Sequence, residues 1–218
     1  MAASSVLRWL DGRGWLVLAG GGSQFDSGEV RSLALGRAAA DGGVACVPLS
    51  ADPYAGDRLL DDIDTLGAPS SYLVDVLSED DVTVQARLSE ASVIVVESAP
   101  TVEDARSALI GAALDGIQAA FVNGAVVLVE GTCAAILGSW ILNAEGRVIP
   151  GVEWLEGSLV LASSQDVAER ARPVLDEQPA AVVLGIEPGS AIALGPDGQI
   201  EVWAARQVKL VLGSAYST

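Results

Sequence analysis

One cysteine stands where a buried strand meets the start of a helix. Residues 126–137 read Val-Val-Leu-Val-Glu-Gly-Thr-Cys-Ala-Ala-Ile-Leu, so an apolar run passes through Gly131 and Thr132 into Cys133. A sharp strand-to-helix turn with small neighbours is the pattern of a nucleophile elbow, which exposes a reactive side chain above a sheet. The chemistry that this spacing indicates is amide hydrolysis or acyl transfer by the Cys133 thiolate.

The usual partner of such a nucleophile is missing, because the 218 residues include no histidine. A helix amino terminus would lower the pKa of the Cys133 thiol, and Glu97 or another carboxylate would then have to act as the base. The alternative interpretation is that Cys133 is a small buried hydrophobic side chain in a strand-to-helix turn.

Two further loops follow apolar strands, Gly20-Gly-Gly-Ser23 and Glu97-Ser-Ala-Pro100. In open α/β sheets, ligands bind beyond the carboxyl ends of the strands, so these loops and the elbow are expected to line one cleft. The ligand-binding residues predicted there are Gly21, Gly22, Glu97, Ser98, Thr132 and Ala134. Neither GxGxxG nor GxxxxGK[ST] occurs, which favours a tight turn over a nucleotide site at the three glycines, and we expect no cofactor.

Alternating strands and helices must position these loops. Apolar runs predict strands at residues 15–19, 44–48, 71–76, 92–97 and 125–129, and apolar positions three and four apart predict helices at residues 29–40, 57–66, 81–91 and 105–121. This alternation predicts an α/β fold with a mostly parallel, doubly wound sheet.

The alternation of strands and helices ends near Pro150 and Gly151, and the rest of the sequence is rich in predicted strands. One more helix is expected at residues 165–175, ending near Pro173, followed by strands at residues 181–186, 191–194, 200–204 and 208–212. The turn signal at residues 195–198 predicts an antiparallel hairpin over residues 191–204. We expect this tail to extend the same sheet, so that residues 1–218 form a single domain.

Composition excludes several classes of protein. The formal net charge is −17, with 29 acidic and 12 basic residues, which makes nucleic acid and anionic membranes unfavourable partners. The apolar stretches are shorter than the ~20 residues that cross a bilayer, and the amino terminus does not resemble a signal peptide. Cys46 and Cys133 have neither disulfide-scaffold nor zinc spacing. We therefore expect a cytoplasmic protein, and we interpret the acidic clusters at residues 61–64 and 79–81 as solvated faces, not as metal ligands.

The motifs together resemble a known family. Residues 131–135, Gly-Thr-Cys-Ala-Ala, are similar to the Gly-Thr-Ser-Ala-Gly elbow of the cyanophycinase and dipeptidase E family of serine peptidases. Residues 16–22 resemble its opening strand and glycine loop, residues 91–96 the strand before its Gly-Gly-Asp loop, and residues 184–202 its carboxyl-terminal hairpin. The resemblance covers nearly the whole chain and implies a flavodoxin-like fold of the class I glutamine amidotransferase type.

The departures from the family pattern fall where its chemistry would be. The resemblance maps the nucleophilic serine to Cys133, and the Gly-Gly-Asp loop that helps to form the oxyanion hole to residues 97–100. The family's histidine would fall between residues 157 and 168, where this chain has none. Loss of an imidazole removes roughly 10²–10⁴-fold from catalysis, and Glu97 would place negative charge near a developing oxyanion.

Three hypotheses follow from these residues. The first is a degenerate member of the family without peptidase activity, which binds a small peptide-like or cationic ligand. The second is a hydrolase or acyl transferase that depends on Cys133. The third is a structural partner, such as a homodimer subunit, in which the elbow is vestigial.

Overall fold

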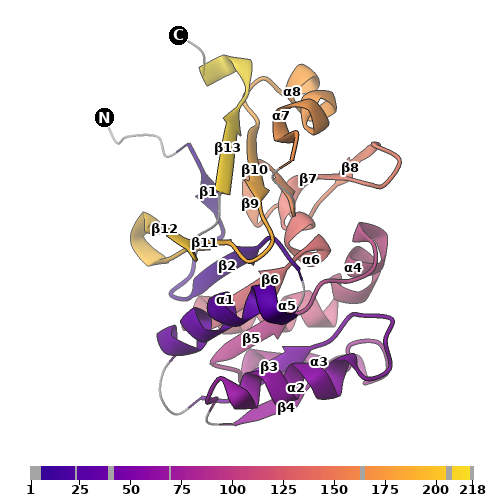
Figure 1. Ribbon diagram of the computed structural model, residues 1–218, viewed down its shortest axis with the longest axis vertical. Coiled ribbons are helices and arrows are strands. Elements are labelled where there is room, and N and C mark those ends of the chain that lie inside the picture. Colours follow the sequence, from indigo (N-terminus) through magenta and orange to yellow (C-terminus); the bar gives the residue numbers. More distant parts are fainter. Residues whose placement is uncertain are drawn as a thin grey trace.

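Two β-sheets organise the computed structural model of the chain (Figure 1), which describes residues 6–22, 24–38, 42–68, 70–162, 165–204 and 208–216. The larger sheet has the strand order β12-β11-β2-β6-β5-β3-β4. Its parallel strands are β2 (Trp15–Ala19), β6 (Val126–Glu130), β5 (Val93–Val96), β3 (Val44–Val47) and β4 (Ser71–Leu73). Strand β11 (Ala191–Leu194) runs antiparallel to β2, and β12 (Ile200–Trp203) antiparallel to β11.

Helices cover both faces of this sheet. Helices α1 (Gln24–Arg37) and α2 (Ala55–Thr65) pack on one face, and α3 (Asp81–Ser89), α4 (Val102–Leu109) and α5 (Ala112–Asn123) on the other. The central strands are near-continuous runs of Val, Ile and Leu because both of their faces are buried. The predicted fold class, a mostly parallel doubly wound α/β sheet of flavodoxin-like type with a carboxyl-terminal hairpin, is confirmed.

A second, smaller sheet packs beside the first. Its order is β13-β10-β9-β7-β8, with strands β13 (Val208–Leu212), β10 (Val182–Ile186), β9 (Leu155–Leu161), β7 (Gly138–Leu142) and β8 (Val148–Pro150), and β1 (Arg8–Trp9) also pairs with β9. The short helices α7 (Val167–Arg170) and α8 (Arg172–Glu177) lie on its outer side, where Val167, Ala171 and Val174 share a cluster of buried apolar residues with β9 and β10.

The hairpin predicted over residues 191–204 is confirmed as β11 and β12, joined by the 3₁₀ turn Pro196–Gly198. The expectation that the whole tail extends one sheet is wrong, because β10 and β13 belong to the second sheet. The strands β7 and β9, which build that sheet with β10, were not expected from the sequence. A second 3₁₀ turn, Ser214–Tyr216, follows β13.

Two predicted helices are divided. The stretch 105–121 forms α4 and α5, which are separated at Gly111 because this residue has a φ of 117° that a helix interior does not allow. The stretch 165–175 forms α7 and α8. Pro173 lies in the first turn of α8, where a missing N–H costs no hydrogen bond, so this proline starts a helix and does not end one.

Candidate functional site

The three loops with unusual residues meet at the carboxyl edge of the larger sheet. They follow β2, β6 and β5, which are adjacent strands. The N–H of Gly131 donates to the carbonyl of Ala19 at 2.9 Å. A Cβ atom added to Gly21 would lie 3.0 Å from the Cα of Gly131. The glycine loop therefore packs directly on the elbow turn, with little space between them.

The sharp turn between β6 and the next helix, α6 (Thr132–Ala135), is made by Gly131. This residue has φ 58° and ψ −125°, while Cys133 lies inside the helical turn two residues later. In a nucleophile elbow, the reactive side chain is carried by the strained residue of the strand-to-helix turn. Here that backbone conformation falls on a residue that has no side chain.

Ser98 fills the space in which a side chain at position 131 would stand. A Cβ atom on Gly131 would lie 2.3 Å from Ser98 Oγ and 2.7 Å from Ser98 Cβ. Ser98 Oγ also accepts a hydrogen bond from the backbone N–H of Thr132 at 3.2 Å. The N–H that follows the nucleophile is the one that stabilises an oxyanion in an elbow enzyme, and in this chain it is engaged by Ser98.

Hydrogen bonds hold this arrangement together. Thr132 Oγ1 donates to the carbonyl of Ala99 at 2.7 Å and lies 3.1 Å from Ser98 Oγ. The loop after β5 is thereby fastened to the first turn of α6. Opening a pocket above Gly131 would require these bonds to break.

The environment of Cys133 disfavours a thiolate. The side chain is fully buried, and its Sγ donates to the carbonyl of Glu97 at 3.2 Å. Burial raises the pKa of this thiol to about 12. The pKa of this thiol therefore shifts in the direction opposite to the lowering expected at a helix terminus, because desolvation is the largest contribution to it.

Charged side chains lie buried beneath the same edge. Arg31 of α1 donates to both carboxylate oxygens of Glu130, from Nε at 2.9 Å and from Nη2 at 2.7 Å, and its Nη1 donates to Asp62 of α2 at 2.7 Å. We call Arg31, Asp62 and Glu130 the buried ion cluster. Burial alone would lower the pKa of Arg31, but its hydrogen bonds and the charges of Glu130 and Asp62 raise it, so the guanidinium remains charged.

Glu97 is half-buried next to this cluster. Burial raises the pKa of its carboxyl, and the positive charge of Arg31 only partly offsets that effect. Its Oε2 atom is buried and has no hydrogen-bond partner among the described residues. Glu97 therefore has incomplete hydrogen bonding at this edge, as does Ser190 beside the glycine loop, whose buried Oγ also has no partner among the described residues.

The structure thus brings most of the predicted site residues together, although not as an open cleft. Gly22 is exposed, and Glu97, Ser98 and Thr132 are partly exposed, whereas Gly21, Cys133 and Ala134 are buried. The elbow pattern predicts Gly131 only as a small neighbour of Cys133, and the motifs predict no role for Arg31 or Glu130. An acidic residue at the end of a buried strand was the available signal, because such a carboxylate requires a cationic partner.

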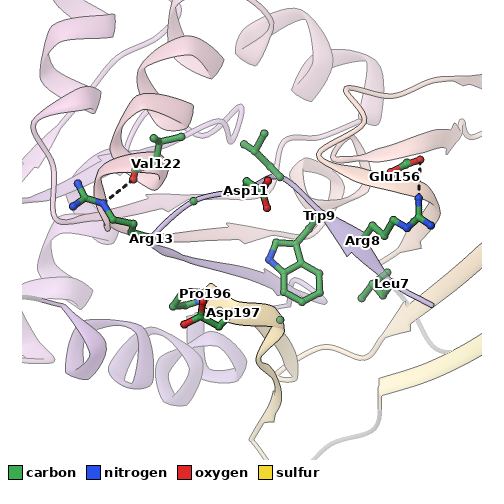
Figure 2. Close-up of a pocket in the computed structure, with 13 residues that line it drawn as sticks. Leu7, Arg8, Trp9, Asp11, Arg13, Val122, Glu156, Pro196 and Asp197 are labelled. Atoms are coloured by element: carbon green, nitrogen blue, oxygen red, sulfur yellow. Dashed lines mark hydrogen bonds and ion pairs between the residues drawn. The ribbon is translucent and has the colours of Figure 1, made fainter. Parts of the chain in front are cut away.

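A large cavity lies at the opposite edge of the sheet. It has a volume of about 970 Å³ and is formed by the segment before β2, by Glu156 and by the hairpin turn after β11. Figure 2 shows Trp9 between Asp11 and the turn that carries Pro196 and Asp197. Arg13, in the same wall, donates to the carbonyls of Val122 and Asn123 at the end of α5. None of the predicted site residues lines this cavity.

The described residues contain neither a metal-binding cluster nor a membrane-spanning helix. No group of three or more Cys, Asp or Glu side chains is arranged to hold a metal ion. No helix in the described ranges has both the length and the apolar character that crossing a bilayer requires.

Two solved structures share the fold. A peptidase from an acI-B1 Actinobacterium is 17% identical, with a TM-score of 0.73 over 93% of this chain and 96% of that one. A putative peptidase E protein from Listeria monocytogenes is 14% identical, with a TM-score of 0.65 over 88% of this chain and 99% of that one. No protein-family model matches the sequence, and no curated protein sequence matches it either.

Proposed function

We propose that this chain is a degenerate relative of the cyanophycinase and dipeptidase E peptidases, which has lost peptidase activity and acts as a binding protein. The observation that carries the proposal is the glycine in the elbow conformation, with Ser98 occupying the side-chain space above it. The peptidase-like fold and the resemblance of the sequence to the family support the proposed relationship to these peptidases.

Three requirements of peptide hydrolysis are unmet together. Position 131 carries no nucleophile, the following N–H is bonded to Ser98, and the sequence offers no imidazole to move a proton. Removal of one oxyanion donor alone costs roughly 3–4 kcal/mol of transition-state stabilisation. Cys133 does not compensate, because its thiol is buried and its pKa is raised to about 12.

The ligand of this edge is a small peptide-like molecule with a cationic group. Gly22, Glu97, Ser98 and Thr132 are the predicted site residues that reach solvent there. A cation placed next to the half-buried carboxyl of Glu97 would favour its ionised form.

The cytoplasm is the compartment that we propose for the protein. Cys46 and Cys133 are both free thiols buried in separate clusters of apolar residues, so neither is placed to form a disulfide. Unpaired thiols are the norm for proteins of a reducing compartment.

A turnover assay tests the loss of peptidase activity. Purified protein is incubated with an aspartyl dipeptide and with a β-aspartyl-arginine dipeptide, and the release of free amino acid is followed beside an active peptidase of the family. We expect the same background rate for the unaltered protein and for Cys133→Ala. Turnover that Cys133→Ala abolishes would show that the thiol is a nucleophile.

Binding is measured separately, with the same β-aspartyl-arginine dipeptide as the probe. Chemical-shift changes of the Gly22 and Thr132 amides should saturate as the peptide is added, which gives the affinity of the protein for it. We expect this affinity to be at least tenfold lower in Glu97→Gln. Unchanged affinity in Glu97→Gln would refute the role given to this carboxylate. Glu103→Gln, at an exposed carboxylate on α4, is the matched control.

A further inference from the structure

Large aliphatic side chains are exposed on the last strands of both sheets. Val202 is 57% exposed, Leu210 53% and Ile200 48%, and they lie on β12 and β13. We define the edge patch by its exposed members, which are Val6, Ile200, Val202, Leu210 and Leu212. Both strands lie at one side of the molecule in Figure 1, and each is the terminal strand of its sheet in the described part of the chain.

Strand register shows that this patch is a continuation of the core. Val202 pairs with Ile192 and Ile200 with Leu194, and both partners are buried. Residues directly opposite each other share one face of a sheet. The exposed side chains of β12 therefore point to the same side as the buried residues of β11.

In the second sheet, exposed residues of β13 likewise pair with buried residues of β10. Leu210 pairs with the buried Leu184, and Leu212 with the buried Val182. Both of these partners pack in the cluster that also holds Ile192 and Leu194. The apolar layer between the sheets thus extends outward through β12 and β13 until it reaches solvent.

A groove marks the place where this layer opens. It has a volume of about 280 Å³ and is lined only by Val, Leu and Ile, with Leu184 and Ile192 buried at its base and Val202 and Leu210 exposed beside it. Single exposed apolar residues are normal on a protein surface, but a contiguous apolar groove between two sheet edges marks a contact surface.

We propose that the edge patch is a homodimer interface, in which β13 pairs antiparallel with β13 of a second copy about Leu210. This register is self-complementary, because it sets Val208 opposite Leu212 and Lys209 opposite Val211 of the other copy. The exposed leucines of both copies then lie on one face, where they close the groove. A twofold contact of this kind buries the same patch on both subunits.

The absence of carboxylates on β13 favours contact with a second copy of the chain at this surface. With a net charge of −17, two copies repel each other, and this repulsion is weakest for a contact that contains no carboxylates. Strand β13 reads Val-Lys-Leu-Val-Leu, so its single charged residue is a cation. In the proposed register, Lys209 opposes an apolar residue, and no pair of like charges is directly opposed.

The size of the patch is adequate for the centre of an interface. Five aliphatic side chains at about half exposure present roughly 400 Å² of apolar surface, which is typical of the largest patch on a monomer. A standard interface buries ~800 Å² on each partner. The backbone of five paired residues and the polar rim would supply the remainder.

The first test is the mass in solution. Analytical ultracentrifugation at about 50 μM should give twice the chain mass of 22.2 kDa, and Leu210→Asp should give the monomer mass with an unchanged circular dichroism spectrum. Val82→Asp is the matched control, because Val82 is 78% exposed on α3 and outside the patch, and it should remain dimeric. A monomeric unaltered protein, or a dimeric Leu210→Asp, would overturn the proposal.

The second test fixes the register. The thiols introduced by Leu210→Cys would stand directly opposite each other, within the distance that a disulfide requires, and mild oxidation should give a covalent dimer. Lys209→Cys should not cross-link, because its two copies would be diagonal and about 7–8 Å apart. The native thiols are buried and do not interfere. Equal cross-linking of both variants would refute this pairing.

Discussion

Arg31 forms ion pairs with two carboxylates at the point where β6 ends and the elbow turn begins. Its guanidinium holds both oxygens of Glu130 and one oxygen of Asp62, and the Arg31 and Glu130 side chains are each only 4% exposed. The cluster joins α1, α2 and β6, so it fixes the residue that precedes Gly131.

Removing one partner should be costly, because it leaves buried charge without compensation. We expect Arg31→Met to lower the free energy of unfolding by about 3–5 kcal/mol. Arg147→Met, which removes an exposed ion pair with Glu145, should change it by less than about 1 kcal/mol. Urea unfolding followed by fluorescence measures both changes in the free energy of unfolding. Equal changes would show that the buried ion cluster stabilises the protein no more than an exposed ion pair does.

Glu97 should make stability depend on pH. Since burial raises the pKa of its carboxyl, the folded state binds a proton more tightly than the unfolded chain does. The resulting stabilisation is complete below the ordinary pKa of about 4.3 and is lost as the pH rises through the raised folded-state value.

Glu97→Gln removes the pH-dependent contribution of this carboxyl group to stability. Relative to the unaltered protein, the variant should become progressively more stable between pH 4 and pH 7, with Glu103→Gln as the exposed control. Unfolding free energies at several pH values give the comparison. A constant difference across this range would show that Glu97 is not desolvated in the folded protein.

At the scale of elements, Gly131 and Ser98 form one unit. Gly131→Ala introduces a side chain at φ 58° and within 2.3 Å of Ser98 Oγ. The backbone strain costs about 1–3 kcal/mol, and the steric contact adds to it.

A double-mutant cycle separates these two costs. We expect Gly131→Ala to be less destabilising in a Ser98→Gly background, with a coupling energy of about 0.5–3 kcal/mol. The destabilisation caused by backbone strain at residue 131 should remain in the Ser98→Gly background. Additive effects in urea unfolding would mean that Ser98 does not occupy the side-chain space of residue 131.

The sequence predicted the elements that carry long apolar runs and missed those that do not. Strands β2, β3, β5 and β6 were expected because a buried parallel strand is an uninterrupted run of branched apolar residues. Strands β7 and β9 contain glycine and serine within short runs, and their pairing is set by tertiary contacts. These interior strands of the second sheet therefore could not be placed from local pattern.

The candidate site illustrates a related limit. Sequence similarity aligned Cys133 with a nucleophile, whereas the backbone dihedral angles place the elbow conformation at Gly131. A two-residue difference of this kind is invisible in a motif, because glycine and small residues occur on both sides of the turn. The loops themselves were predicted correctly as neighbours, since adjacent parallel strands bring their carboxyl ends together.

At the scale of the whole molecule, the acidic charge opposes the compact state. With 29 acidic and 12 basic residues, self-repulsion should be screened by salt. We expect the melting temperature to rise by several degrees between about 10 mM and 500 mM sodium chloride, measured by calorimetry at pH 7. A falling melting temperature would instead show that surface ion pairs dominate.

The two sheets and their helices preserve a peptidase-like scaffold while the space above the elbow is closed. Our proposal is that this fold binds a ligand at its carboxyl edge without supplying a reactive side chain there. Catalysis would require a nucleophile, a free oxyanion donor and a proton carrier in one place. Position 131 is a glycine, the Thr132 N–H is bonded to Ser98, and the sequence has no histidine.

Thiol reactivity is the most direct measurement of this account. Iodoacetamide labelling is followed by mass spectrometry from pH 5 to pH 9 for the unaltered protein and for the double variant Gly131→Cys with Ser98→Gly. We predict that Cys133 and Cys46 remain unlabelled in the folded protein, because burial raises the pKa of both thiols to about 12, and that the thiol introduced at position 131 reacts readily. Rapid labelling of Cys133 below pH 7, with Cys46 inert, would contradict the account.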